Sequence, residues 1–363
     1  MSFFNLSNIQ KALFHAPFIR KSNYFKMAVH TFLESKVLKK TITYPKVINF
    51  LLTMKCNLRC EVCHAHDALL SSGSNELKTD FIKSFIQQCG SFSPDWHFSG
   101  GEPFAHKDLY QILNEVHSHK MKSSLVSNGL LITQKKLEQI KPGALSAIIF
   151  SIMGDEKGHD KEVMKVGAFQ TLVKNIQLFA KYQPTCKIFL NLILTPSLVD
   201  NIKKVFEDIK TLPIEGIKFT HLNYLTSSEI EDYKIYATDH DFGNQKAYSY
   251  RNDFSMDDYL NKLKAIDFTQ SPFPYQFAPD LSQNDLSNWY NQDFSLTRKC
   301  HFIWYSTFLY SDGQIKSCQF LQEPMGNIKD KPIIEIWNSP KYQKFRQSID
   351  KKMSSACARC CKL

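Results

Sequence analysis

Three cysteines lie close together in the segment Cys56-Asn57-Leu58-Arg59-Cys60-Glu61-Val62-Cys63, directly after the apolar run Val47–Met54. Their C-x3-C-x2-C spacing puts three thiols on one tight loop, where all of them can face one inorganic cluster. A four-iron, four-sulfur cluster has four iron corners, which thiolates usually hold. Three local ligands therefore leave one iron open to a small molecule, as a catalytic zinc ion keeps one position open. The alternatives are a structural zinc loop, although zinc ligands usually come in paired C-x2-C spacings, or buried core thiols.

A second segment, Ser99-Gly100-Gly101-Glu102-Pro103, follows a short strand expected at Trp96–Phe98. Glycines let backbone approach a ligand closely, and the Glu102 carboxylate can accept hydrogen bonds from an ammonium group. Together the two segments resemble the radical S-adenosylmethionine (radical SAM) enzymes, over roughly residues 45 to 363. The resemblance implies that the open iron chelates the methionine amine and carboxylate of SAM. It also implies that Gly100, Gly101 and Glu102 bind that amine.

The composition sets broad limits on the protein. The chain has 363 residues, of which 43% are hydrophobic, enough for one large domain and a smaller one. Ten cysteines without a secretory signal pattern predict a cytoplasmic protein, in which cysteines serve metals more often than disulfides. No apolar run approaches the length of about eighteen residues that spans a membrane. The net charge of +10 permits nucleic acid, anionic lipid or a phosphorylated substrate and selects none of them.

The first 45 residues form a basic segment in which aromatic and aliphatic residues alternate with lysines and arginines. This pattern predicts one or two amphipathic helices. We expect residues 1–45 to pack against the main domain; peripheral contact with an anionic membrane surface is the alternative.

From Val47 to Leu222 short apolar segments alternate with amphipathic ones, which predicts parallel strands joined by right-handed helical crossovers. The strands are expected at Val47–Thr53, Trp96–Ser99, Ser123–Ser127, Leu145–Met153, Ile188–Thr195 and Ile217–Leu222. The pattern alone does not distinguish a sheet from a barrel. The resemblance implies an α/β fold in which residues 46–224 form a partial (β/α)6 barrel. Ligand sites in such folds gather at the carboxyl ends of the strands, where Cys56–Cys63, Gly100–Glu102 and Ser127–Gly129 all lie.

Residues 225–298 lose the alternation of strand and helix and are dense in tyrosine and phenylalanine. We interpret this range as a cap whose aromatic side chains fill a core; a substrate lid over the barrel mouth is the functional alternative.

Five further cysteines, Cys300, Cys318, Cys357, Cys360 and Cys361, lie in the last 64 residues. A hairpin turn is expected at Ser311-Asp312-Gly313. With the segments Gly326-Asn327-Ile328 and Glu335-Ile336-Trp337-Asn338, residues 299–363 resemble the SPASM/twitch class of C-terminal extension. The resemblance implies one auxiliary 4Fe-4S cluster, which we assign to Cys300, Cys318, Cys357 and Cys360, with Cys361 spare. A zinc ribbon on the same thiols is the alternative.

Several polar residues at strand ends are further candidates for contact with SAM. The resemblance places Ser151 at the SAM ribose and Asn191 facing the SAM, and we add Ser127 and Asn128 at the end of the third strand. Relatives often have an arginine three residues beyond the Asp of a His-Asp pair, where this chain has Val163. The remaining thiols, Cys89 and Cys186, are interpreted as core residues.

The combined interpretation is a radical SAM oxidoreductase that cleaves SAM to a 5′-deoxyadenosyl radical and abstracts hydrogen from an unactivated carbon. A flavodoxin, ferredoxin or reductase would supply the electron. Residues 1–45 look too short for a peptide-recognition domain, so we expect a small-molecule substrate, a sugar-like metabolite or a lipid precursor. A peptide-modifying maturase is the first alternative. A zinc- or iron-stabilised nucleic-acid-binding protein is the second, although the scattered lysines do not form the stripe expected of it, and we expect no nucleic acid partner.

Overall fold

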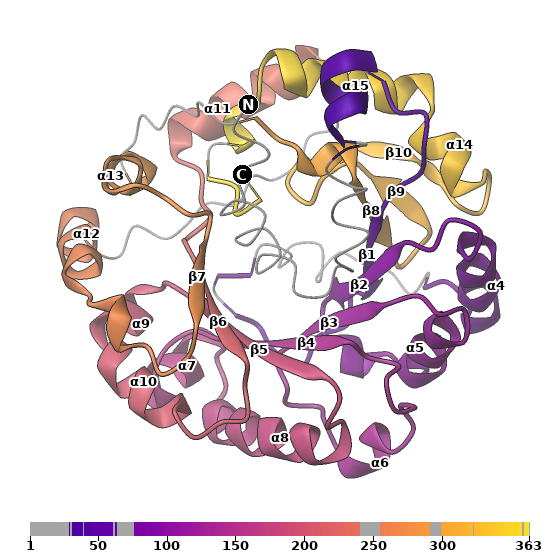
Figure 1. Cartoon of the computed structure of the whole chain (residues 1–363). Helices are drawn as coiled ribbons and strands as arrows, with labels where there is room; N and C mark the ends of the chain where they lie inside the picture. Colours follow the sequence, from indigo (N-terminus) through magenta and orange to yellow (C-terminus); the bar gives the residue numbers. More distant parts are fainter. Residues whose placement is uncertain are drawn as a thin grey trace.

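The computed structural model describes residues 29, 31–38, 40–60, 62–63, 76–239, 255–290, 299–321, 323–357 and 359–362. Within these residues one ten-stranded sheet runs in the order β10-β9-β8-β1-β2-β3-β4-β5-β6-β7. Its strands are β1 (Val47–Thr53), β2 (Asp95–Gly100), β3 (Ser123–Ser127), β4 (Ala147–Ile152), β5 (Lys187–Ile193), β6 (Gly216–Thr220), β7 (Tyr275–Ala278), β8 (Ser306–Tyr310), β9 (Gln314–Lys316) and β10 (Pro324–Asn327). From β8 through β1 to β7 each strand is parallel to the next. Figure 1 shows that they curve around a common interior, with helices on the outside.

The helices follow from the spacing of apolar residues. Those that cover the sheet are α4 (Thr79–Cys89), α5 (Leu109–Ser118), α6 (Gln134–Leu137), α7 (Glu156–Glu162), α8 (Ala168–Tyr182), α9 (Pro196–Asp200), α10 (Ile202–Ile209) and α12 (Met256–Ala265). The helix α8, for example, buries Phe169, Leu172, Ile176 and Phe179, a repeat of three or four residues that forms one apolar face. Burying such a face against the sheet stabilises the fold by roughly 25 cal/mol for each Å² of apolar surface removed from water.

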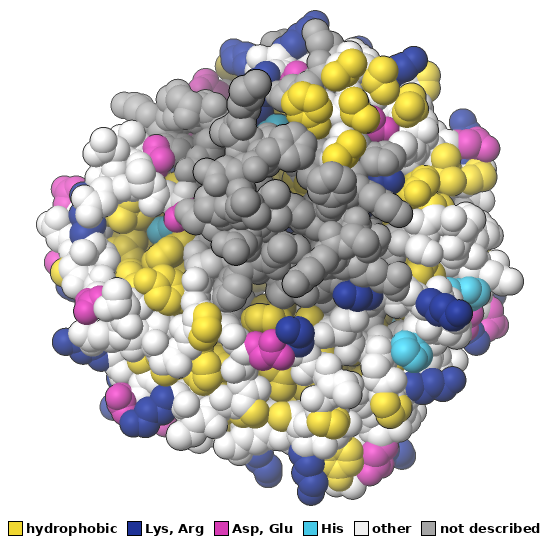
Figure 2. All heavy atoms as spheres, viewed as in Figure 1, with side chains coloured by type: hydrophobic (Ala, Val, Ile, Leu, Met, Phe, Trp, Pro, Cys, Tyr) yellow, Lys and Arg dark blue, Asp and Glu magenta, His cyan; other side chains and the backbone are white. Residues whose placement is uncertain are grey.

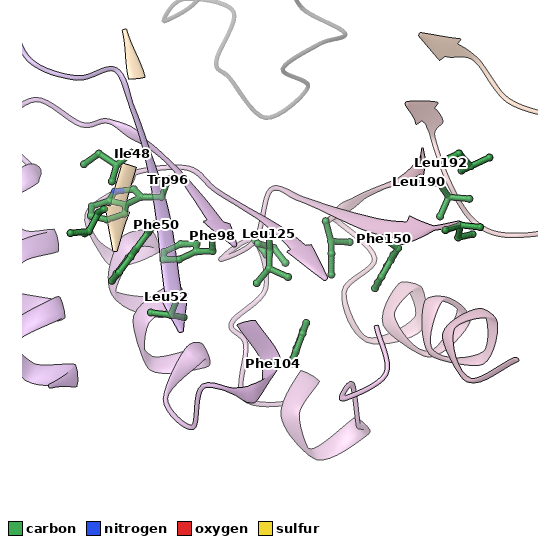
Figure 3. Packing of buried hydrophobic residues seen from close by; sticks show 14 of the residues in the cluster. Ile48, Phe50, Leu52, Trp96, Phe98, Phe104, Leu125, Phe150, Leu190 and Leu192 are labelled. Carbon is green, nitrogen blue, oxygen red and sulfur yellow. The ribbon is translucent and has the colours of Figure 1, made fainter. Parts of the chain in front are cut away.

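The main core lies between the sheet and this helical layer. On β1 the side chains Ile48, Phe50 and Leu52 point to it, and Trp96 and Phe98 of β2 lie beside them (Figure 3). Because side chains of a strand alternate between its two faces, the residues between these point to the barrel interior. The partial barrel expected from the sequence is confirmed, and its six strands extend to eight parallel ones.

The range that we interpreted as a cap contributes to the barrel. Among residues 225–239 and 255–290 lie α11 (Ser227–Asp239), α12, β7 and α13 (Gln283–Tyr290), and β7 pairs in parallel with β6. The strand β7 has four residues and follows two prolines, so its apolar pattern is too short to predict a strand. Many of the aromatic residues here are buried, including Tyr233, Tyr259, Trp289 and Tyr290. The alternative of a substrate lid was stated for the whole range 225–298, of which residues 240–254 and 291–298 lie outside the described residues.

After β8 the chain turns at the expected hairpin, since β8 pairs antiparallel with β9, and then forms β10, α14 (Ile333–Trp337) and α15 (Pro340–Lys351). The described part of the N-terminal segment contains a short π-helix, η2 (Leu33–Leu38), and then packs against this region: Gln343 and Arg346 of α15 hydrogen-bond to Thr41. Residues 1–28 lie outside the described part, so membrane contact stays a prediction.

Two surface features bear on partners. None of the described helices has the length and hydropathy needed to cross a bilayer. On the face shown in Figure 2, the Lys and Arg side chains of the described residues are spread around the rim and interspersed with Asp and Glu.

Candidate cluster and cofactor site

The three segments singled out from the sequence meet at one edge of the sheet. The loop with Cys56, Cys60 and Cys63 follows β1, Gly100–Glu102 ends β2, and Ser127–Gly129 ends β3. Because β1, β2 and β3 are adjacent and parallel, their carboxyl ends lie side by side.

The backbone of Gly101 and Glu102 holds the start of the cysteine loop. The Gly101 N–H donates to Thr53 O at 2.7 Å, and the Glu102 N–H donates to Lys55 O at 2.8 Å. A Cβ atom on Gly101 would lie 2.3 Å from Lys55 O, and one on Gly100, where φ is +119°, would lie 2.3 Å from Thr53 O. Both positions therefore require glycine because the chain's own backbone approaches them, whatever ligand binds there.

The Glu102 carboxylate connects the ends of β2 and β3. It is 1% exposed and accepts hydrogen bonds from Ser127 Oγ at 2.9 Å, from the Asn128 N–H at 2.8 Å and from the Phe104 N–H at 3.0 Å. Burial raises the pKa of Glu102, and these three donors oppose that shift. A carboxylate has about four acceptor positions, so one position is left for a ligand such as an ammonium group. Contact between Glu102 and SAM stays a prediction.

The thiols of Cys56, Cys60 and Cys63 lie near one another. Burial and the neighbouring Cys63 and Cys56 raise the pKa of Cys60 to about 12. The Leu58 N–H donates to Cys56 Sγ at 3.4 Å, and Asn128 Nδ2 lies 3.9 Å from the same sulfur. Burial also raises the pKa of Cys56, so without a metal Cys56 and Cys60 keep their protons, whereas a bound cation deprotonates a coordinating thiol. The loop is thus suited to hold an iron–sulfur cluster by its thiolates, with N–H groups directed at sulfur.

A row of polar side chains crosses the other half of the barrel. Strand register pairs Ser151 of β4 with Asn191 of β5, Asn191 with Lys218 of β6, and Lys218 with Gln276 of β7. Thr220 Oγ1 donates to Asn191 Oδ1 at 2.6 Å. Ser151 and Asn191 therefore lie at one level of the barrel, as expected if both contact SAM. Their contact with SAM stays a prediction.

The recurring His159-Asp160 pair has a structural role. The Asp160 carboxylate accepts from the N–H groups of Gly167 at 2.6 Å and Phe169 at 2.9 Å, so it anchors the beginning of α8. His159 is buried and accepts at Nδ1 from the Met153 N–H at 3.3 Å. Val163, where an arginine was expected, is 2% exposed and packs with Met153 behind the cysteine loop.

The second set of thiols converges at the carboxyl end of the chain. Burial and the nearby Cys318 raise the pKa of Cys300 to about 12. Burial, Cys318 and Cys300 raise the pKa of Cys357. The Phe320 N–H donates to Cys318 Sγ at 3.3 Å, and the Lys362 N–H donates to Cys360 Sγ at 3.4 Å. The structure thus brings together the four residues that we assigned to the auxiliary cluster.

Cys361 lies in the same group. The adjacent Cys360, together with Lys362 and Lys218, lowers the pKa of Cys361 well below its usual value. The structure holds five thiols where one four-iron cluster needs four. Cys361 as the spare thiol stays a prediction. Within the described residues, no three His, Cys, Asp or Glu side chains are arranged to hold a single metal ion.

Cys89 and Cys186 differ from both sets. Cys89 is fully buried under the sheet, where burial alone raises its pKa, and Cys186 Sγ donates to Lys187 O at 3.7 Å. Both residues belong to the main core, in accordance with the interpretation from sequence.

The sequence analysis missed Lys218 and Arg359. Lys218 is a single charged residue inside the apolar strand Gly216–Thr220, and Arg359 lies between Cys357 and Cys360. Both charged residues can be recognised in the sequence, but only the packing shows which way each side chain points.

Comparison with known proteins identifies the fold. A family profile described as "Radical SAM superfamily" matches residues 50–209, and a profile described as "Iron-sulfur cluster-binding domain" (SPASM) matches residues 300–361. The chain belongs to the radical SAM superfamily. It carries a SPASM domain at its C-terminal end, so it has a SAM-binding 4Fe-4S cluster, SAM and an auxiliary cluster as cofactors.

Individual relatives differ in how much of the chain they match. An "AdoMet-dependent heme synthase" of Methanosarcina barkeri is 26% identical over 317 residues, which are 85% of this chain and 86% of the relative. A "PqqA peptide cyclase" of Bradyrhizobium diazoefficiens is 28% identical over 120 residues, 33% of this chain and 31% of the relative. The crystal structure of SuiB from Streptococcus suis bound to S-adenosylmethionine superposes with a TM-score of 0.63 at 16% identity, covering 95% of this chain and 79% of SuiB. The last similarity shows the fold alone.

Proposed function

We propose that this radical SAM enzyme abstracts a hydrogen atom from an unactivated carbon of a small-molecule substrate, with a net oxidation of that substrate. The observation that carries the proposal is the position of the loop with Cys56, Cys60 and Cys63. Backbone hydrogen bonds from Gly101 and Glu102 fix the start of this loop at the mouth of the barrel. Held by Cys56, Cys60 and Cys63, the cluster would supply one electron for cleavage of the SAM sulfonium bond to methionine and a 5′-deoxyadenosyl radical.

In this proposal the residues of the chain bind and orient the cluster and SAM. In the proposal Cys56, Cys60 and Cys63 hold the SAM-binding cluster, and the segment Gly100–Glu102 binds the methionine amine of SAM. The row that contains Ser151 and Asn191 offers hydrogen-bonding groups to the adenosyl part. In the proposal the barrel also shields the site from water, which matters because a carbon radical must meet its substrate before it meets solvent.

Support for a small molecule comes from the extent of the similarities. The relative named heme synthase matches 85% of this chain, whereas the relative named peptide cyclase matches 33% of it. The narrower expectation of a sugar-like metabolite or a lipid precursor stays a prediction without support from these names. A peptide-modifying reaction is the second candidate, because one of the similar folds is that of SuiB bound to a precursor peptide.

The test is anaerobic purification, reconstitution with iron and sulfide, and chromatography of the products of SAM with dithionite. We expect 5′-deoxyadenosine, about eight irons in the wild type from two four-iron clusters and about four after joint replacement of Cys300 and Cys318 by alanine. Cys89→Ala, which removes a core thiol, is the matched control and should keep about eight irons. A wild type with about four irons and stoichiometric zinc would overturn the auxiliary cluster.

The reaction type has its own test. With a substrate deuterated at the reacting carbon, we expect the label in 5′-deoxyadenosine, one molecule of which forms per product. Return of deuterium to the product, or attachment of adenosine to it, would contradict the net oxidation and leave the radical SAM chemistry intact. Stimulation of SAM cleavage by a peptide fraction and not by metabolites would favour the peptide-modifying alternative.

A further inference from the structure

The barrel contains one charged residue at a position where charge is costly. In strands β1 to β8 the residues Asp95, Lys187 and Lys218 are the only Asp, Glu, Lys or Arg side chains. Asp95 and Lys187 are the first residues of β2 and β5, and Lys187 is an exposed partner of Glu215 at 2.9 Å. Lys218 is the third of the five residues of β6. A lysine inside a barrel strand loses hydration, so its presence calls for a compensating group.

Lys218 points to the barrel interior. Its neighbours Ile217 and Phe219 are 1% and 0% exposed and belong to the core under the outer helices, so the side chain between them lies on the opposite face. Strand register puts Lys218 beside Asn191 and Gln276. The ammonium group therefore lies at the level of the residues that we expect to contact SAM.

A second lysine, a histidine and a thiol lie near Lys218. Burial and the charge of Lys362 lower the pKa of Lys218 to about 8, and Cys361 opposes that shift. Burial, Lys362 and Lys218 also lower the pKa of His97 to about 3, although His97 is on β2, across the barrel from β6. The groups that face Lys218 are thus Lys362, His97 and the thiol of Cys361. Among the described residues, no carboxylate forms an ion pair with Lys218.

Two explanations can account for this charge. Lys218 can balance the negative thiolates of the second thiol set, since Cys361 is near, or it can bind an anion that enters the barrel. Lys362 is adjacent in sequence to Cys361 and already supplies a positive charge there. Strand register puts Lys218 in one row with Asn191 and Ser151, so its side chain faces the barrel interior at the level of the expected SAM site. This position favours the second explanation.

We propose that Lys218 binds an acidic group, a carboxylate or a phosphate, of the substrate, so that the enzyme selects anionic small molecules. This inference rests on the proposed function, because it assumes that the substrate enters the barrel beside SAM. It makes Lys218 a specificity-determining residue, while the reacting carbon belongs to another part of the same molecule.

The first experiment measures binding of inorganic phosphate and of acetate to the reconstituted holoenzyme by titration calorimetry at constant ionic strength. A charge-assisted hydrogen bond to the anion predicts that Lys218→Gln weakens binding about 10- to 100-fold. Lys218→Arg keeps the charge and should restore most of the affinity. Lys187→Gln removes a lysine from the neighbouring strand outside the barrel and should bind both anions as the wild type does.

The second experiment adds acidic and neutral fractions of a metabolite extract to wild-type enzyme with SAM and dithionite, and measures 5′-deoxyadenosine. Stimulation by the acidic fraction supports the proposal. Its loss after phosphatase treatment identifies a phosphate, and its persistence identifies a carboxylate.

Three results separate this inference from the proposed function. Equal anion binding by wild type and Lys218→Gln overturns the role of Lys218, as does stimulation by the neutral fraction alone. A change in the iron content or visible spectrum of Lys218→Gln with unchanged anion affinity also overturns it and makes Lys218 a counter-charge of the second thiol set. Absence of 5′-deoxyadenosine from the wild type would instead refute the proposed function, whereas the calorimetry does not depend on SAM cleavage.

Discussion

Replacement of Arg359 is expected to empty the auxiliary site while the SAM-binding site stays intact. Arg359 is 2% exposed and lies between Cys357 and Cys360. Its Nη1 donates to both carboxylate oxygens of Glu229 on α11, and its Nε donates to Trp289 O at 2.6 Å. The guanidinium carbon also lies 4.3 Å from the ring centroid of Tyr224. One buried cation thus connects the cysteine segment to two helices.

The magnitude follows from the burial of both charges. Removing one partner of a buried ion pair costs about 3–5 kcal/mol, because the other charge stays buried without compensation. Arg359→Met should therefore lower the free energy of unfolding by that amount, since Glu229 is 8% exposed. The segment with Cys357 and Cys360 loses its anchor, so the iron content should fall from about eight to about four. The double replacement Arg359→Met with Glu229→Leu should be less destabilising than the single one, since neither charge is left unpaired.

The assay compares urea midpoints, iron content and 5′-deoxyadenosine formation with dithionite. Lys187→Met breaks the exposed pair with Glu215 and is the matched control, with an expected loss of about 0–1 kcal/mol and unchanged iron. If Arg359→Met keeps all of its iron and unfolds at the wild-type midpoint, the ion pair does not anchor the auxiliary site and the reasoning is refuted.

Three further outcomes are expected at the SAM-binding site. Alanine at Cys56, Cys60 or Cys63 should abolish 5′-deoxyadenosine formation, because each change removes a cluster ligand; normal turnover in any of the three would contradict the ligand set. Glu102→Ala should weaken SAM binding, measured by equilibrium dialysis, about 10- to 100-fold, and unchanged affinity would show that the carboxylate is only a brace. Gly101→Ala should lower the iron content, since the added Cβ would meet Lys55 O at 2.3 Å and displace the cysteine loop; full iron loading would show that the loop tolerates the shift.

The sequence predicted the first half of the barrel well because its elements are long and strongly patterned. The strands Val47–Thr53 and Ser123–Ser127 have the predicted bounds. It did not predict that β8 pairs in parallel with β1, with Val47 opposite Ser306. A five-residue apolar segment predicts a strand but does not identify the strand with which it pairs. Partners so distant in sequence are not joined by a local turn that would identify them.

At the site, residue types were predictable and their partners were not. The glycines at positions 100 and 101 were expected to admit a ligand, whereas the structure shows that the backbone of β1 and of the residues directly after it fills that space first. Glu102 was expected to face an amine, and three of its acceptor positions are used by Ser127, Asn128 and Phe104. Such contacts depend on which strand ends become neighbours, and this is a property of the sheet and not of the local sequence.

The pairing of β8 with β1 explains why a cysteine of each thiol set contacts the same apolar group. It brings Phe302, Phe308 and Tyr310 against Leu51 and Met54, and both Cys63 and Cys300 pack against this apolar group. A parallel neighbour of β1 cannot reach it through a tight turn, so the chain must first complete the barrel and return. The C-terminal extension therefore depends on the barrel for its position, and the two cluster sites share a wall from which water is excluded. A change in that wall, unlike loss of a single ligand, should disturb both sites together.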